Sequence, residues 1–357
     1  MTATPDLCDP GIDSRTVNGR QQMTDVTAVI IPFFQREPGI LARAIASIDA
    51  QRLATGHAID VIVVDDASPR PAAEELSGFS TRDSVSVRII RQANGGAAAA
   101  RNTGLDAVSP GTRWVAFLDS DDIWGPDHLA RAHRALASGA AMYFADNWVE
   151  PGISWFAEFP AFESAIGREF SCVNDADRVY KFAEGMAVEA FINACLGHLS
   201  TIVLDAALVA LLRMDEQLRF GEDHLFLVDA ASRTDHIVFS RCRDVSRGHG
   251  SDLFRSTLDW NHPSSAERAF CAMVKYCRMK EIVVQSPRLR TLLNAKIAMT
   301  RRELIFLIVR NARRFPQETF RVLRRAIAFD PAILASGWRT LPELALAKMR
   351  GKLDFRT

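Results

Sequence analysis

Four short runs of apolar residues, each ending in a polar or acidic loop, constrain most strongly what this chain can fold into. The runs cover residues 27–31, 59–64, 85–90 and 114–118. Apolar residues at helical spacing over 40–48 follow the first run, and an Ala-rich helical segment follows the third. Strands that alternate with helices in this way predict βαβ units with parallel strands and right-handed crossovers. The runs lack polar alternation, so we expect helices on both faces of the sheet.

The loops that follow the four runs are the candidate site. In an open parallel sheet, ligands bind beyond the carboxyl ends of the strands, and these ends meet at one edge. Two of the four loops carry adjacent carboxylates, which makes this edge acidic. The loops are Pro32-Phe33-Phe34-Gln35, Asp65-Asp66, Gln92-Ala93-Asn94-Gly95 and Asp119-Ser120-Asp121-Asp122.

The last loop places three carboxylates, Asp119, Asp121 and Asp122, within four residues. Like charges this close repel unless a cation neutralises them, and an i, i+2 pair in an extended turn can direct both groups toward Mg²⁺ or Mn²⁺. A solvated acidic turn ahead of the next helix is the alternative. An EF-hand is excluded, because its sixth and twelfth positions would be Trp124 and Ala130. A phosphohydrolase of the haloacid-dehalogenase type, with Asp119 as nucleophile, is compatible with the local pattern.

The other loops offer groups for a nucleotide. Asp65-Asp66 either caps the turn that follows or accepts hydrogen bonds from a base or ribose. Asn94-Gly95-Gly96 precedes Arg101 and offers backbone N–H groups at a helix start with a guanidinium further along, which suits a diphosphate. Phe33-Phe34 stacks on a base or belongs to the core. The chain contains neither a Walker A loop nor a GxGxxG fingerprint.

Charge and composition narrow the class of protein. The chain has 43 basic and 43 acidic side chains, and this balance argues against a nucleic-acid partner. No apolar run reaches the roughly 18–20 residues that cross a bilayer, and the N-terminus lacks the apolar stretch of a secretory signal. Six scattered cysteines lack the spacing of a zinc site. We therefore expect a cytoplasmic protein with reduced thiols.

The zero net charge hides a basic C-terminal region. Residues 301–357 hold 13 Lys and Arg against 5 Asp and Glu, a net charge of +8. The pattern predicts a helix with Phe320, Leu323 and Ile327 on one face and arginines mostly elsewhere. Such a helix either lies peripherally on an anionic membrane surface or packs on the rest of the chain with a solvated basic face.

Four segments together carry a resemblance to a known family. They are Val29–Phe34, Val63–Ser68, Asn94–Asn102 and Phe117–Trp124. Their order and spacing resemble those of a family 2 glycosyltransferase with the GT-A fold, clearly over about 27–135 and then fading. More loosely, the whole chain is similar to bacterial exopolysaccharide glucosyltransferases of the succinoglycan-building type. The resemblance implies an α/β fold, in which a Rossmann-like, mostly parallel sheet is flanked by helices and followed by a mainly helical extension.

The resemblance also suggests a division of the chain. Residues 1–24, which are polar and aperiodic, form a disordered lead-in. Residues 25–255 form the glycosyltransferase domain, with a nucleotide-sugar half at 25–125 and an acceptor half at 126–255. Residues 256–357 form a helical, basic C-terminal region.

Site roles follow from the same resemblance. Phe34 and Asp66 would hold the uracil and ribose of a UDP-sugar, and Arg101 would lie near the phosphates. Asp119 and Asp121 match the family's DxD, which binds the ribose and a divalent metal, Mg²⁺ or Mn²⁺. The predicted substrate-binding residues are Pro32, Phe34, Asp65, Asp66, Asn94, Arg101, Asp119, Ser120 and Glu222.

Two further motifs complete the predicted site. Glu222-Asp223 resembles the family's "ED" motif, in which the Asp is the general base, although a carboxylate at a helix N-terminus is also stabilised by the dipole. Arg247-Gly-His249 resembles the motif whose His approaches the metal or diphosphate. The chain departs from the family at Phe34-Gln35, where Tyr-Asn is commoner, and at Asp66-Ala67-Ser68, where Asp-Gly-Ser is commoner.

The implied activity is a metal-dependent, inverting sugar transfer. The donor would be a nucleotide sugar, with UDP-glucose expected, and the acceptor a lipid-linked oligosaccharide of exopolysaccharide synthesis on the cytoplasmic face of the inner membrane. One direct displacement on a UDP-α-sugar would give a β-linkage. The alternatives are the phosphohydrolase with Asp119 as nucleophile and a non-catalytic nucleotide-binding module.

Overall fold

The computed structural model describes residues 25–150, 152–248 and 258–334. The lead-in predicted for 1–24 and the predicted His249 lie outside the described residues. The strands are β1 (Asp25–Phe33), β2 (His57–Asp65), β3 (Val85–Arg91), β4 (Thr112–Phe117), β5 (Ile123–Trp124), β6 (Met142–Glu150), β7 (Ile153–Ser154), β8 (Ser171–Asn174), β9 (Val179–Lys181), β10 (Val203–Asp205) and β11 (Ile237–Ser246). The helices are α1 (Ile40–Asp49), α2 (Ala72–Glu75), α3 (Gly96–Asp106), α4 (His128–Ala137), η1 (Phe156–Glu158), α5 (Pro160–Ala165), α6 (Ala187–Asn193), η2 (Leu199–Thr201), α7 (Ala206–Val209), α8 (Glu222–Ser232), α10 (Ser265–Ile282), α11 (Pro287–Asn311) and α12 (Pro316–Phe329).

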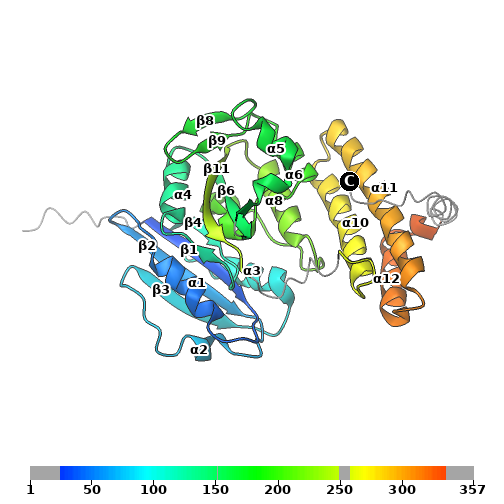
Figure 1. Ribbon diagram of the computed structural model, residues 1–357, viewed down its shortest axis with the longest axis horizontal. Coiled ribbons are helices and arrows are strands. Elements are labelled where there is room, and N and C mark those ends of the chain that lie inside the picture. Colours follow the sequence, from blue (N-terminus) through cyan, green and yellow to red (C-terminus); the bar gives the residue numbers. More distant parts are fainter. Residues whose placement is uncertain (1–24, 151, 249–257, 335–357) are drawn as a thin grey trace, which may run out of the picture.

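One twisted sheet runs through the described part of residues 25–246, in the order β3-β2-β1-β4-β10-β6-β11-β9-β8 (Figure 1). The first four strands are parallel, as predicted from the apolar runs. β10 is antiparallel to both β4 and β6. Residues 199–201 form η2, and β10 begins only at Val203.

Both faces of the sheet are covered, which confirms the α/β class. Alternate side chains of β1 point to opposite faces. Ala28 and Ile30 join a core cluster with α3, whereas Val29 and Ile31 join a separate cluster with α1. Gly104 brings α3 against β1, since a Cβ there would meet Ile30 Cγ2 at 2.4 Å. This close packing fixes the helix whose first turn faces the predicted nucleotide loops.

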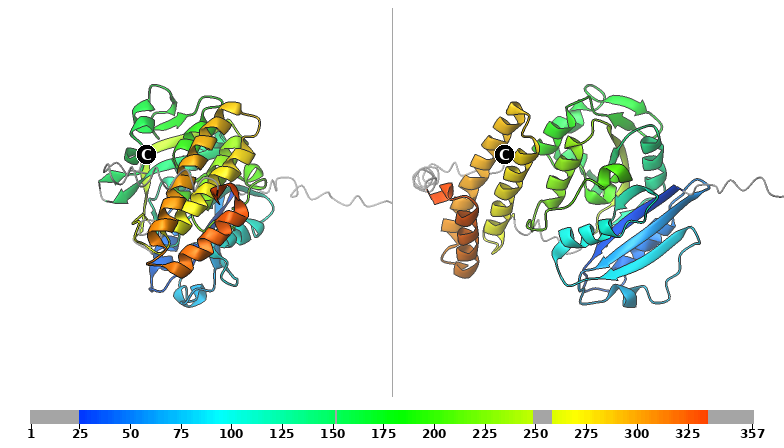
Figure 2. Two further views of the ribbon diagram at one scale, coloured as in Figure 1. Left: turned by 90° about the vertical axis from the view of Figure 1, so that its right-hand side faces the viewer. Right: turned by 180° about the vertical axis from the view of Figure 1, so that it is seen from behind.

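The C-terminal helices α10, α11 and α12 form a bundle beside α8 (Figure 2). Buried residues of α8, such as Phe226, and of α10, such as Phe270, belong to the same core cluster as α3. The C-terminal region therefore packs on the sheet domain through a continuous apolar core. This contact places the middle of α10 next to the first turn of α8.

The predicted apolar face of α12 is wrong in one respect. Its buried side chains are Thr319, Val322 and Ala326, while Phe320 is 67% exposed. Leu323 packs only partly against the core. Within the described residues, none of the helices has the length and apolarity that a bilayer crossing requires.

Candidate active site

Asp65, the last residue of β2, supports the loop that follows it. Its Oδ1 accepts a hydrogen bond from the Ser68 N–H at 2.8 Å, and its Oδ2 accepts one from the Ala72 N–H at 2.8 Å. Only 2% of the residue is exposed. Backbone donors of its own loop thus occupy both oxygens. Of the two roles that the sequence allows for Asp65-Asp66, Asp65 therefore caps the turn that follows it.

Asp66 joins two of the predicted loops. Its carboxylate accepts hydrogen bonds from the N–H groups of Gly95 and Gly96, each at 2.8 Å, and from Gln92 Nε2 at 2.8 Å. Asn94 Nδ2 donates to the Asp66 carbonyl at 3.0 Å. The structure therefore brings Asp66 and Asn94 together at the N-terminus of α3, where backbone donors and the helix dipole favour negative charge.

Ala67, between these loop-forming groups, has φ of 54°. This is the left-handed region, where a Cβ is crowded and glycine is favoured. The departure from Asp-Gly-Ser noted in the sequence therefore places a non-glycine residue in a strained conformation. Strain of this kind is tolerated where the surrounding contacts fix the backbone, as the Asp65 and Asp66 hydrogen bonds do here.

The remaining residues of the first loop differ in exposure. Phe33 is 1% exposed and belongs to the core, whereas Phe34 is 42% exposed at the sheet edge. Pro32 lies within β1 opposite Val64. Ser120 is buried, and its hydroxyl accepts a hydrogen bond from Gln35 Nε2 at 3.0 Å. Of the two aromatic rings, only Phe34 is placed to stack on a base.

Arg101 links the nucleotide side to the predicted base motif. It lies on α3, five residues after Gly96, a rise of about 7.5 Å along the helix. Its guanidinium donates to Asp119 Oδ1 at 2.7 Å and to Glu222 Oε1 at 3.2 Å. Arg101 Nε is buried without a hydrogen-bond partner among the described residues. A buried guanidinium with one unused donor is suited to a further anion.

Burial and neighbouring charges set the protonation states of Asp119 and Glu222. Burial has the largest single effect and raises the pKa of Asp119, but the charge of Arg101, its hydrogen bond and other nearby basic side chains together lower that pKa overall. Burial, together with the charge of Asp223, raises the pKa of Glu222 to about 7. Asp119 is thus held ionised, while Glu222 is easily protonated.

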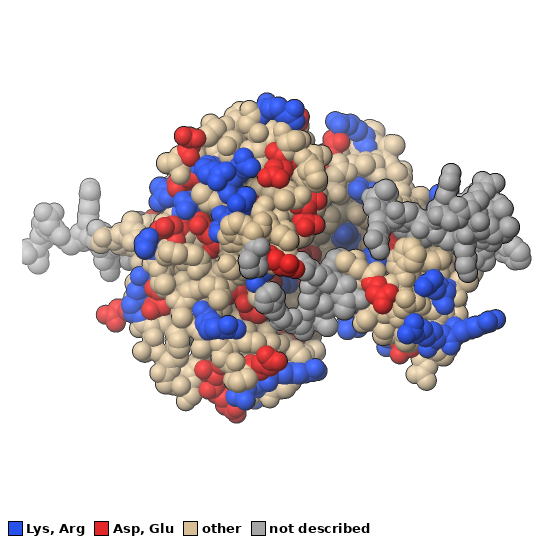
Figure 3. All heavy atoms as spheres, viewed as in Figure 1, with Lys and Arg blue, Asp and Glu red and all other residues tan. Residues whose placement is uncertain are grey.

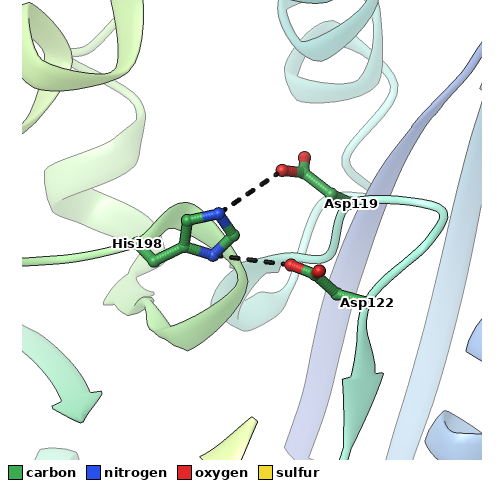
Figure 4. A group of neighbouring side chains, drawn as sticks. All are labelled: Asp119, Asp122 and His198. Atoms are coloured by element: carbon green, nitrogen blue, oxygen red, sulfur yellow. Dashed lines mark ion pairs between the residues drawn. The ribbon is translucent and has the colours of Figure 1, made fainter. Parts of the chain in front are cut away.

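Asp122 and His198 lie beside Asp119 at the end of β4 (Figure 4). His198 Nδ1 is 3.4 Å from Asp122 Oδ2, and His198 Nε2 is 3.9 Å from Asp119 Oδ2. Burial lowers the pKa of His198 to about 3, and burial raises the pKa of Asp122 to about 8, with the charges of Asp119 and Asp121 adding to the increase. The imidazole is therefore neutral and has a lone pair for a metal.

The three residues fit a divalent cation. One ligand atom from each of Asp119, Asp122 and His198 lies within 4.8 Å of the others. His198 Nδ1 is buried without a hydrogen-bond partner among the described residues, so a donor atom is unused. Carboxylate oxygens suit Mg²⁺ and Mn²⁺, and imidazole is a common ligand of transition metals such as Mn²⁺. The donor set matches the type of cation that the sequence predicted.

Ser200 and Gly248 hold this loop in place. The Ser200 hydroxyl donates to Asp122 Oδ2 at 2.6 Å and accepts from the Asp119 N–H at 3.0 Å. The Gly248 N–H donates to Asp122 Oδ1 at 2.8 Å. A Cβ at Gly248 would come within 2.2 Å of the Asp121 carbonyl oxygen, so this close approach requires glycine. The residue before the predicted His249 thus lies against Asp121.

Asp223 lies in the first turn of α8, after Gly221 with φ of 81°. Its Oδ1 accepts a hydrogen bond from the His224 N–H at 2.7 Å. The preceding residue, Glu222, is bound to Arg101, so the predicted base lies one residue from the cluster that contains Asp119. The geometry therefore brings together predicted residues separated by about 100 positions in the chain.

Comparison with known proteins decides the family. Residues 28–177 match the family described as glycosyl transferase family 2. The chain is 31% identical over 323 residues to the succinoglycan biosynthesis protein ExoW of Rhizobium meliloti, covering 90% of this chain and 98% of that protein. The chain belongs to glycosyl transferase family 2. The family predicted from the four sequence segments is confirmed.

Two other comparisons give a further sequence relative and a structure of similar fold. Succinoglycan biosynthesis protein ExoO of the same organism is 28% identical over 219 residues, which cover 58% of this chain and 56% of ExoO. The crystal structure of S. aureus TarS 1-349 in complex with UDP-GlcNAc aligns with a TM-score of 0.55 at 14% identity, covering 91% of this chain and 92% of that one. At this identity the likeness concerns the fold, and it supports the predicted GT-A architecture.

The sequence alone did not predict His198 and Ser200 as residues of this site. Neither belongs to a recognised motif. A polar Gly197-His198 pair before a short apolar segment was the available signal for His198. Asp122 was visible as the third carboxylate of its loop but was not assigned to the metal.

Proposed function

We propose that this family 2 glycosyltransferase is a metal-dependent, inverting hexosyltransferase of exopolysaccharide synthesis. Its proposed donor is UDP-glucose, and its proposed acceptor is a lipid-linked oligosaccharide. Similarity to ExoW over nearly the whole chain supports the polysaccharide context. The observation that carries the proposal is the convergence of Asp119, Asp122 and His198 with Arg101 and Glu222 at the strand ends.

The donor nucleotide is proposed to lie along the edge from β1 to β4. Phe34 offers an exposed ring for the uracil, and Asp66, whose N–H donates to the Phe33 carbonyl, lies with Asn94 at the start of α3. Pro32, Asp65 and Ser120 would shape the donor site through the backbone and loop contacts described above. Arg101 would bind the diphosphate, because its guanidinium is buried, charged and has an unused N–H.

Asp119, Asp122 and His198 are proposed to hold the cation, with Asp121 and His249 as further candidates. A bound Mg²⁺ or Mn²⁺ would supply positive charge for the leaving diphosphate. Arg101 stabilises the same developing charge from its place on α3. Asp122 orients the loop through Ser200 and Gly248, so its contribution would be to positioning as well as to charge.

Asp223 is proposed to remove the proton from the acceptor hydroxyl. It lies at the head of α8, next to Glu222, and so can approach the anomeric carbon from the side opposite the diphosphate. A single displacement with a base on that side inverts the configuration and would give a β-linkage from a UDP-α-sugar.

The arginine-rich end of the C-terminal bundle is proposed to contact anionic lipid peripherally. Figure 3 shows basic side chains gathered where α12 lies in Figure 1. Phe320, 67% exposed, would enter the interface beside them. Vesicles containing phosphatidylglycerol should bind the protein, and changing Phe320→Ser should weaken this binding; equal binding to neutral vesicles would contradict it. Within α12 and the turn just before it, the exposed basic residues are Arg313, Arg314, Arg321 and Arg324.

Thermal-shift and transfer assays test the proposed activity. UDP and UDP-glucose with Mn²⁺ should raise the melting temperature, and labelled glucose should pass to lipid-linked oligosaccharide. Binding of UDP without transfer to any acceptor or to water would instead indicate a nucleotide-binding module. Release of phosphate from simple esters would favour the phosphohydrolase.

A further inference from the structure

Two lysines of the C-terminal helices converge on the head of α8. Lys275 of α10 places its Nζ 3.1 Å from His224 Nδ1. Its Cδ would lie 3.0 Å from a Cβ at Gly221, so the side chain packs against the turn that starts α8. The Nζ atoms of Lys275 and Lys296 lie 4.8 Å and 5.7 Å from the centre of the Tyr276 ring. Two helices thus each bring a cation to the same aromatic ring.

His224 fixes the orientation of Lys275. The His224 Nε2 atom is 2.5 Å from the Phe191 carbonyl oxygen, so this nitrogen carries the proton and donates. Burial lowers the pKa of His224 well below its usual value, and the imidazole is neutral. Its Nδ1 is therefore an acceptor for one N–H of the Lys275 ammonium, and two N–H groups remain.

Neither lysine has a carboxylate partner at ion-pair distance among the described residues. Burial lowers the pKa of both Lys275 and Lys296, and the charge of Lys296 lowers that of Lys275 further. Asp223 and Glu222 act on Lys275 in the opposite direction. Partly buried like charges without direct partners are costly, and a bound anion would offset that cost.

We propose that Lys275 and Lys296 form an acceptor subsite for an anionic group, a carboxylate or phosphate carried by the acceptor saccharide. This rests on the proposed function, because the role of Asp223 as base makes the head of α8 the acceptor side. Lysine ammonium groups bind either anion through charge-assisted hydrogen bonds. An anion held there would orient the neighbouring sugar hydroxyl toward Asp223.

The donor diphosphate is assigned elsewhere. Arg101 and the Asp119 cluster lie on the α3 and β4 side of Glu222, whereas Lys275 and Lys296 approach from α10 and α11. Arg101 on the one hand and the two lysines on the other therefore approach the head of α8 from different elements. A purely structural role, with both stems covering Tyr276, would leave anion binding unaffected.

Titrations with small probes test this subsite. Full-length protein is first saturated with UDP and Mn²⁺, so that the donor site is filled. Methyl glucuronide, glucose 1-phosphate and neutral methyl glucoside are then titrated by calorimetry. Wild type should bind one anionic probe at least about tenfold more tightly than the glucoside. The glucuronide and the phosphate separate the two sources of negative charge.

Substitutions test whether the two lysines cause the preference for the anionic probe. Lys275→Gln and the double variant with Lys296→Gln should lose the preference for the anionic probe, while Lys181→Gln, an exposed lysine on β9, should keep it. Equal binding of charged and neutral probes by wild type, or an unchanged preference in the double variant, would overturn the subsite. All variants should retain UDP binding. If wild type fails to bind UDP, the proposed function itself is wrong.

Discussion

The two aspartate pairs at the sheet edge look alike in the sequence and do different work in the structure. Asp65 and Asp66 follow β2, and backbone N–H groups occupy both carboxylates. Asp119 and Asp122 follow β4, and their carboxylates face the side chains of Arg101, His198 and Ser200. The first pair shapes loops, whereas the second pair forms a charged cluster.

The difference shows that a carboxylate's role depends on what surrounds it. Asp65 is satisfied by residues three and seven positions later, so its partners are local. Asp119 and Glu222 meet on Arg101 across separations of 18 and 121 positions. Locally satisfied carboxylates stabilise the fold, while carboxylates assembled from distant segments retain capacity for a ligand.

Asp119→Ala removes one carboxylate of the second pair. Of the substitutions considered, it should have the largest effect on activity. We expect sugar transfer to fall by about 10³-fold or more, because the variant loses a proposed metal ligand and the partner of Arg101. Mn²⁺ should no longer stimulate the variant. In the wild type, chelation of the metal should abolish activity. Steady-state assays of UDP release measure both effects. Asp106→Ala, an exposed aspartate on α3, is the control, and equal losses in the two variants would refute the distinction.

Asp223→Asn tests the proposed base beside this cluster. Transfer should fall by about 10²-fold or more, because the amide cannot accept the proton. UDP affinity should remain within about threefold of wild type, which calorimetry would establish. Turnover like that of the wild type would place the base elsewhere.

Two buried histidines, His128 and His133, also show how the surroundings of a side chain set its protonation. Burial lowers the pKa of each to about 3. Only the unfolded chain then binds protons between about pH 6.5 and 3, so stability is lost as pH falls through that range. The cost at pH 4.5 is on the order of 2–3 kcal/mol per histidine.

Urea unfolding at several pH values measures this loss. His128→Leu should show a shallower fall in the free energy of unfolding between pH 7 and 4.5, because one buried imidazole is removed. His236→Leu, an exposed histidine, is the control. Parallel curves for wild type and His128→Leu would show that His128 does not stay neutral in the fold.

Asp65→Ala should act mainly on stability. The N–H groups of Ser68 and Ala72 would lose their partner, and the free energy of unfolding should fall by about 2 kcal/mol. Chemical denaturation measures the change. A drop under about 0.5 kcal/mol would mean that the two carboxylate pairs do not differ in the way described.

Ala67→Gly gives the smallest effect. Glycine relieves the crowding at φ of 54°, but it adds flexibility to the unfolded chain. We expect a net gain of about 0.5 kcal/mol, measured by denaturation of both proteins under the same conditions. A clear loss of stability would show that the loop does not hold Ala67 in a left-handed conformation.

The sequence predicted the parallel half of the fold and the loops of the donor side. Uninterrupted apolar runs identify buried parallel strands, and the residues after them lie at one edge, so Asp66, Arg101 and Asp119 could be predicted together. The family resemblance added Glu222 and Asp223. The helical C-terminal region followed from the resemblance, and a helix around Phe320 followed from its spacing.

The remaining site residues depend on long-range packing. His198 reaches Asp119 only because η2 lies against the end of β4 before the short antiparallel β10. Lys275 reaches the head of α8 through the packing of α10, and no local pattern encodes that contact. Phe320 is exposed although the sequence predicted it on the apolar face. The spacing of apolar residues in this helix is compatible with several orientations of the helix about its axis.

The central claim is that the Asp119 loop binds a cation together with the donor diphosphate. Crystals grown with UDP and Mn²⁺, measured at the manganese absorption edge, test it directly. The account predicts an anomalous peak between the Asp119 carboxylate and the UDP phosphates, with Arg101 contacting the same diphosphate. UDP bound without manganese at that loop, or manganese bound elsewhere, would contradict it.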